Sequence, residues 1–332
     1  MARAFIKKTN WEKGLGLALA GIWGASFLPQ TLGLSRYQKT LANYLEDGTE
    51  QPMDAKVDEL TQKVLYMINM DINLEMKLKT FMCYGTDPVS RGSVAVRTGA
   101  IVGLPHIFAY SEAADVQKQV FQIYNEYSYR GINWDTDAGK QFLDSMLLSD
   151  NAKMFGIARE IKYAQSHSVY IEAAMRSIGC AVAFTGYKFL SRTVLGAIPS
   201  APVKLIGLAG VCGITYVLYI SLLDYYNCWK DQRVDLNTCR LSMDIANGGV
   251  EFYEKMLQRN IAARVLLGKR GELQYTVYGN EHTTLRRPHQ PLSHRLMMVK
   301  KVRDSLMDNP PPPVRFDSKA DEDTTVGFGK VF

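Results

Sequence analysis

Long apolar segments interrupt the polar chain at three places. Residues 14–34 carry no charge, residues 203–223 carry one lysine at their edge, and residues 177–199 contain two basic side chains near their end. At a rise of about 1.5 Å per residue, a helix of this length approaches the roughly 30 Å hydrocarbon core of a bilayer. The pattern predicts an N-terminal transmembrane helix at 14–34 and a transmembrane helical hairpin over 177–223. For the hairpin, a buried helical pair in a soluble core is the alternative.

Two polar regions, 35–176 and 224–305, have the mixed periodicity of an α+β domain. Four stretches have the pattern of helices, with apolar positions every three to four residues or with helix-capping residues at their ends. Two further stretches alternate apolar and polar positions and are rich in β-branched residues, which is typical of strands. The expected helices are 53–70, 138–168, 231–246 and 250–267, with a break at Asn247–Gly249, and the expected strands are 77–84 and 93–104. Three membrane crossings place both regions on one side of the bilayer. We therefore expect them to be the first and second parts of one mostly helical α+β domain.

Charge and composition mark the two ends of the chain. The segment 1–13 is basic, with Arg3, Lys7 and Lys8 among its residues. A basic flank before a retained membrane segment is typical of an uncleaved mitochondrial import signal and equally of an ordinary membrane anchor. The segment 306–332 contains four consecutive prolines and an acidic run, which predicts a flexible, extended tail.

The overall composition excludes two classes of protein. With 47% hydrophobic and 22% charged residues, the chain is not disordered throughout. The net charge of +6 comes from scattered basic residues, so we expect no nucleic-acid partner. The five cysteines include no C-x-x-C pair, and we expect no disulfide framework, although Cys228 and Cys239 are able to pair in an oxidising compartment.

One helical stretch has the frame of a zinc-binding helix without its histidines. Residues 158–163 read A-R-E-I-K-Y, where a zinc-peptidase helix has A-H-E-x-x-H. Glu160 keeps the position of the catalytic glutamate, but Arg159 and Tyr163 stand at the two histidine positions. A guanidinium repels Zn²⁺, and a phenol with an ordinary pKa near 10 does not compensate. We expect no metal, no cofactor and no catalytic residue here. The alternative, from spacing alone, is a charged and solvated helix face.

The order of elements resembles the M48 family of membrane-integrated metallopeptidases. In that family the zinc helix is followed by hydrophobic helices and then by an E-x-x-x-D motif, whose glutamate is the third zinc ligand. In this chain Asp231 and Asp235 of D-Q-R-V-D occupy the positions of that glutamate and aspartate. The resemblance implies a degenerate M48 metallopeptidase-like domain with an N-terminal anchor and an inserted transmembrane hairpin. It carries the architecture of the family without its chemistry.

A second resemblance covers most of the chain outside the tail. The block NGGVEFYEKMLQRNIAARVLLGKRGELQYTVYGN, from Asn247 to Asn280, is similar to the C-terminal signature of the transmembrane protein 177 family, and two further blocks, 147–166 and 98–108, resemble other parts of it. The resemblance implies a multi-pass protein of the mitochondrial inner membrane. It also implies a non-catalytic assembly factor that supports early maturation of cytochrome c oxidase subunit II by stabilising the assembly chaperone of that subunit. Both proteins, and the lipid bilayer, are then its partners.

An active membrane-bound metallohydrolase with non-standard ligands is the competing hypothesis. It requires a metal bound through Glu160, Asp231 or Asp235, with a histidine brought from afar, such as His106 or His167. The other three histidines, His282, His289 and His294, match no standard ligand spacing, and we expect them to be solvated in a polar loop.

The first apolar segment also contains a stripe of small residues. Gly16, Ala20 and Gly24 are spaced by four, which places them on one face of a helix and permits close contact with another helix in lipid. With few spans available inside this chain, the stripe is a candidate contact for a partner helix.

Overall fold

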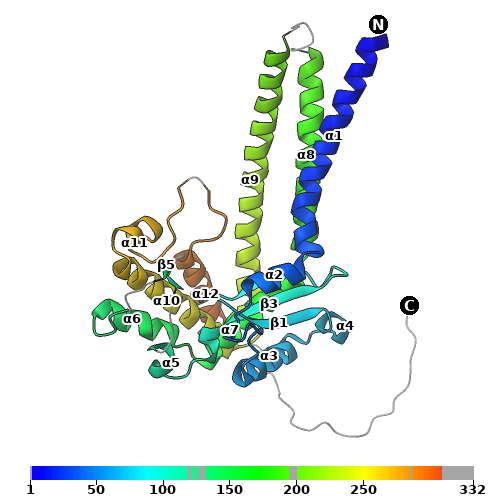
Figure 1. Cartoon of the computed structure of the whole chain (residues 1–332). Helices are drawn as coiled ribbons and strands as arrows, with labels where there is room; N and C mark the ends of the chain where they lie inside the picture. Colours follow the sequence, from blue (N-terminus) through cyan, green and yellow to red (C-terminus); the bar gives the residue numbers. More distant parts are fainter. Residues whose placement is uncertain are drawn as a thin grey trace, which may run out of the picture.

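The fold consists of three long helices that project side by side from a domain of shorter helices and a small sheet (Figure 1). The computed structural model describes residues 2–117, 122–123, 126–127, 132–193, 200–284 and 286–308. The projecting helices are α1 (Ala2–Thr31), α8 (Ser168–Thr193) and α9 (Ala201–Cys239). The mostly helical α+β class is thereby confirmed. All but the first three residues of the predicted tail, 306–332, lie outside the described part.

The remaining helices build the domain. They are α2 (Leu34–Leu41), α3 (Ala55–Ile68), α4 (Ile72–Glu75), the 3-10 helix η1 (His106–Ala109), α5 (Ala113–Gln117), α6 (Asp137–Met146), α7 (Asp150–Gln165), α10 (Met243–Leu266), α11 (Lys269–Gln274) and α12 (Leu292–Asp308). α3 lies within the predicted helix 53–70, and its first turn is capped by Asp54, whose side chain accepts from two backbone N–H groups.

Among the described helices, α9 is the one that is by itself long and apolar enough to cross a membrane. Its most apolar window has a mean hydropathy of 2.0, and none of that window is buried inside the protein. Ile206, Ile214 and Leu218 are 71%, 67% and 63% exposed. Apolar surface of this extent marks a contact with lipid or with a partner. α9 continues well past the predicted end at residue 223, because no glycine or proline interrupts the chain from there to Cys239.

The other two predicted spans differ from expectation. α1 ends at Thr31, and a bend of 63° leads into α2; this bent pair is the second candidate span. α8 begins at Ser168, earlier than predicted, and it does not qualify alone, since it carries charged residues such as Glu172 and Lys188. α8 lies antiparallel to α9, and Glu172 near its start forms a 3.5 Å ion pair with Lys230 toward the end of α9. The hairpin is therefore present as a helix pair of which one arm qualifies as a span.

The small sheet has the strand order β1–β3–β2. β3 (Ala100–Pro105) is central and buried throughout; it runs parallel to β1 (Leu78–Cys83) and antiparallel to β2 (Val89–Gly92). The predicted strand 77–84 is confirmed as β1. The predicted strand 93–104 is wrong in its first half, because Gly92 and Gly99 adopt φ values of 80° and 77° and enclose a turn. β4 (Gln122–Ile123) and β5 (Glu126–Tyr127) form a separate pair.

The core joins the two polar regions that flank the helix pair in sequence, since α7 packs closely against α10. Gly248 and Gly249 lie inside α10, so the predicted helix break at Asn247–Gly249 is wrong. A Cβ at Gly248 would lie 2.2 Å from the carbonyl oxygen of Asn151, and a Cβ at Gly249 would lie 2.7 Å from the Phe155 ring. The glycines serve the close approach of two helices rather than the end of one.

Two further differences concern helix ends and an element without a predicted counterpart. The predicted helix 138–168 is divided into α6 and α7, and Ser149 caps α7, since its side chain accepts from the N–H of Ala152. α12 has no predicted counterpart, although its core-facing residues, among them Leu296, Val299 and Leu306, recur at helical spacing. All five cysteines are free, and Cys228 and Cys239 stand about three turns apart on α9, too far to pair.

Candidate functional site

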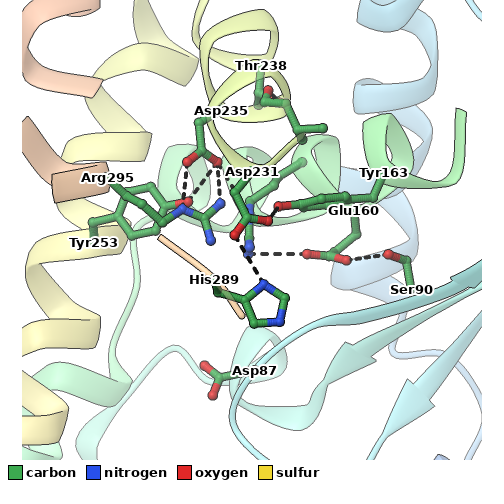
Figure 2. A network of polar contacts seen from close by, with 12 residues as sticks. Asp87, Ser90, Glu160, Tyr163, Asp231, Asp235, Thr238, Tyr253, His289 and Arg295 are labelled. Atoms are coloured by element: carbon green, nitrogen blue, oxygen red, sulfur yellow. Dashed lines mark hydrogen bonds and ion pairs between the residues drawn. The ribbon is translucent and has the colours of Figure 1, made fainter. Parts of the chain in front are cut away.

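The predicted motif residues converge at the base of the projecting helices. Arg159, Glu160 and Tyr163 lie on α7, while Asp231 and Asp235 lie one turn apart on α9 and face them (Figure 2). α7 and α9 contact each other along this line. The two motifs therefore meet in space, although 68 residues separate Tyr163 from Asp231.

Asp235 accepts hydrogen bonds from two other helices. The Nε and Nη2 atoms of Arg295 on α12 donate over 2.7 and 2.6 Å, and the hydroxyl of Tyr253 on α10 donates over 2.8 Å. Arg159 Nε lies 3.4 Å from the same carboxylate as an ion pair without hydrogen-bond geometry. The side chains of Asp235 and Arg295 are 2% and 6% exposed. Such charges are stable in the protein interior only because they neutralise one another.

Asp231 is the second buried carboxylate of the network. It accepts from the hydroxyl of Tyr163 and from the backbone N–H of Gln290 at 3.2 Å, and His289 Nδ1 lies 3.1 Å from it. Burial alone would raise its pKa, but the hydrogen bond with His289, the charge of Arg295 and the Tyr163 hydroxyl hold the pKa of Asp231 well below its usual range. Asp231 is therefore an ionised, fully engaged acceptor.

Glu160 lies at the opposite edge of the network, toward the sheet. Its carboxylate lies 3.2 Å from Arg159 Nη1 and accepts from the Ser90 hydroxyl at 2.7 Å. Burial raises the pKa of Glu160, and the Arg159 charge and the Ser90 hydrogen bond offset only part of this effect. The Arg159 guanidinium also lies over the Tyr163 ring, 5.2 Å from its centroid.

These residues do not fit a zinc ion. A zinc site needs several unengaged imidazole, thiolate or carboxylate ligands converging on one point. Here the carboxylates of Glu160 and Asp235 are occupied by guanidinium groups, and Arg159 lies between them. Over the described part of the chain, no three His, Cys, Asp or Glu side chains are grouped to hold a metal ion. The network is an ion-pair cluster between α7, α9 and α12.

A cleft of about 430 Å³ opens beside this cluster. Its walls come from β2, from α7, from the start of α8 and from the domain end of α9. Polar side chains line it, among them Ser90, Glu160, Glu172 and Lys230. The junction of α1 and α2 also contributes, through Gln30 and Tyr37. The cleft therefore lies between the sheet and the base of the helices that leave the domain.

Some residues of this site follow from the sequence pattern, and others do not. The alternative of a solvated helix face is wrong, because Glu160 is 4% exposed. His289 was expected to be solvated; its ring is largely exposed, yet it contacts Asp231. Arg295 and Tyr253 were missed, since nothing in their local sequence signals a partner more than 15 residues away. Among the described contacts, none joins His106 or His167 to the cluster.

The predicted small-residue stripe lies on α1, away from the cleft. α1 contacts α8 through Trp23, whose Nε1 donates to the carbonyl of Ala173 at 3.3 Å, and through the carbonyl of Leu19. A Cβ at Gly16 or Gly24 would meet nothing within 4 Å among the described residues. The glycines of the stripe thus face open space, and its role as a contact for a partner helix stays a prediction.

Comparison with known proteins gives one consistent result. The profile of the family described as Transmembrane protein 177 matches residues 38–287. The Transmembrane protein 177 of Xenopus laevis is 27% identical over 304 residues, 90% of this chain and 96% of the relative. The human protein of that name is 30% identical over 246 residues, 72% and 75% of the two chains, and the Rattus norvegicus protein 31% over 245 residues, again 72% and 75%. No solved structure matches the chain. The chain belongs to the transmembrane protein 177 family.

Proposed function

We propose that this protein is a non-catalytic assembly factor of the mitochondrial inner membrane with several membrane-spanning helices. In this proposal it supports early maturation of cytochrome c oxidase subunit II by stabilising the assembly chaperone of that subunit. The membrane setting is supported by family membership and by the apolar α9. The mitochondrial site and the two partners rest on the resemblance of the three sequence blocks described above. The degenerate M48 metallopeptidase-like architecture is part of the same proposal.

One observation carries the non-catalytic part of the proposal: a cleft opens beside three carboxylates that are all engaged with other groups of the protein. Asp235, Asp231 and Glu160 each have at least two partners within the protein. Removing Glu160 or Asp235 from this network to activate water or hold a metal would deprive a buried guanidinium of a counter-charge. These groups therefore suit a surface that binds a peptide segment without reacting with it, and they do not suit a hydrolytic centre.

The free edge of β2 gives the cleft a means to hold a peptide segment. Ser93 N–H donates to Gly99 at 3.1 Å, which fixes the hydrogen-bonding side of this antiparallel pair. Because successive residues point to opposite edges, the backbone groups of Ser90 and Gly92 face away from β3. The Ser90 carbonyl accepts only from the exposed Arg91 side chain, at 3.2 Å, among the described contacts. Such an edge is a template for an added strand.

Site-specific crosslinking in mitochondria tests the proposal. A photoreactive side chain in place of Arg91, at the cleft mouth, should capture subunit II or its chaperone. The same group in place of Met76, which directly follows α4 and is 81% exposed, is the matched control. Capture at both positions alike, or at neither, would argue against a client segment in the cleft.

Two substitutions at one position separate edge pairing from side-chain contact. Ser90→Pro removes the outward N–H without touching the bonds between β2 and β3, whereas Ser90→Ala removes only the hydroxyl. We expect Ser90→Pro to abolish the Arg91 crosslink and Ser90→Ala to keep most of it. A cooperative thermal unfolding transition in both variants would show that both are folded. An equal effect of the two would mean that the backbone edge is not used.

The competing hydrolase is tested directly on the purified full chain. The proposal predicts no stoichiometric zinc and no chelator-sensitive cleavage of peptides. Zinc at one ion per chain, with cleavage lost on chelation and on Glu160→Gln, would overturn it.

A further inference from the structure

The loop between α11 and α12 leaves the domain and runs along α9 (Figure 1). Three contacts fix its second half there. Arg286 donates to both carboxylate oxygens of Asp224, at 2.8 and 3.2 Å; the carbonyl of Arg287 lies 3.5 Å from the Cys228 thiol; and His289 lies 3.1 Å from Asp231. The loop thus follows α9 for two turns, from the cleft toward the projecting end.

The upper end of this loop coincides with the end of the apolar part of α9. Residues 205–223 carry no charge, and Asp224 is the first charged residue after Lys204. A helix of that length spans roughly 30 Å, the hydrocarbon thickness of a bilayer. Aromatic residues that suit a membrane interface follow at once: Tyr225 is 72% exposed and Trp229 47%. When α9 spans the membrane, the Asp224–Arg286 pair lies at the level of the lipid headgroups.

The charge at this level is basic. Asp224 is 13% exposed and is neutralised by Arg286, whose side chain is 49% exposed. Arg287 is exposed, and none of the described contacts gives its guanidinium an acidic partner. Arg233, also exposed, lies nine residues further along α9 toward the domain, over the ring of Trp229, 5.6 Å from its centroid. At the level of Asp224, the guanidinium group of Arg287 matches the geometry of phosphate esters at a membrane surface.

We infer that residues 286–289, held against α9 at the end of its apolar stretch, form a docking surface for the headgroups of anionic phospholipids, with Arg287 as the principal contact. The inference rests on the proposed membrane-spanning role of α9. The loop contacts α9 at Asp224, at the bilayer surface, and at Asp231, beside the cleft. Headgroup binding at Arg287 would therefore hold the cleft at a set distance from the bilayer. A membrane-anchored client would reach the cleft with the residues that immediately follow its transmembrane helix.

The test uses the full chain in nanodiscs of phosphatidylcholine, alone or mixed with an equal amount of phosphatidylglycerol. Anionic lipid should raise the Tm of the native protein, and high salt should reduce the rise. Arg287→Gln should lose most of that rise without changing the Tm in phosphatidylcholine alone. Lys301→Gln, which removes one charge from the exposed face of α12, is the control and should keep the rise.

Three outcomes would overturn the inference. Equal behaviour of Arg287→Gln and the native protein would exclude the loop as the contact. An equal loss in Lys301→Gln would mean a diffuse effect of net charge. A rise reproduced by inorganic phosphate in phosphatidylcholine discs would mean a free-anion site instead of a lipid surface. None of these outcomes bears on the Arg91 crosslink, so this inference and the proposed function fail separately.

Discussion

At the scale of single residues, the site is a chain of alternating charges between three helices. Arg159 lies between Glu160 and Asp235, and Arg295 pairs with Asp235 from the far side. Burying such charges costs several kcal/mol per ion, and the mutual contacts offset the cost only when every member is present. The cluster therefore acts as one unit that holds α7, α9 and α12 together.

Asp235→Ala tests this interdependence. It leaves the guanidinium groups of Arg159 and Arg295 buried without their shared counter-charge, and we expect a loss of about 3–5 kcal/mol in the free energy of unfolding. Denaturant unfolding of the solubilised protein measures it. Lys63→Ala, which breaks the exposed Lys63–Glu59 pair, should cost about 0.5 kcal/mol or less. A similar small loss for Asp235→Ala would show that the cluster contributes little.

Asp231 predicts a pH dependence with a definite sign. Its pKa in the folded protein lies below the usual value of 3.8, through His289, Arg295 and Tyr163 acting against burial. A carboxyl with a lowered folded pKa stabilises the protein above its unfolded pKa, and that contribution is lost as the pH falls toward the folded value. The stability difference between the native protein and Asp231→Asn should be largest near neutral pH and shrink below about pH 4. A difference that is constant with pH would assign the effect to packing.

At the scale of elements, the predictions are confirmed where the local pattern of apolar residues determines the element. They are wrong where contacts with other elements determine it. α3 and β1 follow from their own patterns. The glycine pair of α10 was mistaken for a helix end, because a glycine required by close helix packing and a glycine that ends a helix look alike in sequence. α12 is a different case, since its apolar positions recur at helical spacing and the helix could have been predicted from the sequence.

Gly248→Ala tests the packing role of that pair. The new Cβ would lie 2.2 Å from a backbone carbonyl of α7, which cannot rotate away, and we expect a loss of about 1–3 kcal/mol. Gly213→Ala in α9, where a Cβ meets nothing within 4 Å, is the matched control and should leave the Tm unchanged or slightly higher. Equal Tm values for the two variants would show that α7 and α10 are free to move apart.

At the scale of the whole molecule, the projecting helices determine which parts share a side of the membrane. The N-terminus and the far ends of α8 and α9 lie together, opposite the domain (Figure 1). If all three helices cross, the N-terminus and the domain lie on opposite sides. α8 crosses in this arrangement although its composition alone does not qualify it. Lys188 and Arg192 lie near the far end, where long side chains reach the headgroups, and Arg176 forms an ion pair with Glu172 near the domain end.

Protease protection of tagged protein in sealed and ruptured membrane vesicles measures this topology. A tag before residue 2 and a tag after Asp308 should be cleaved from opposite sides. Cleavage of both tags from one side would mean an even number of crossings, and would remove either the bent α1–α2 pair or α8 from the set of spans.

The sequence alone determined the class of the protein: mostly helical, with an apolar stretch of membrane length, two polar regions and a zinc-type frame whose histidines are replaced. These properties are set by residue type and local spacing, so no tertiary information is needed to find them. Only the tertiary structure decided that Arg295, Tyr253 and His289 complete the cluster around Asp231 and Asp235. Those contacts join elements far apart in the chain, and which helix faces meet depends on packing that no local pattern encodes.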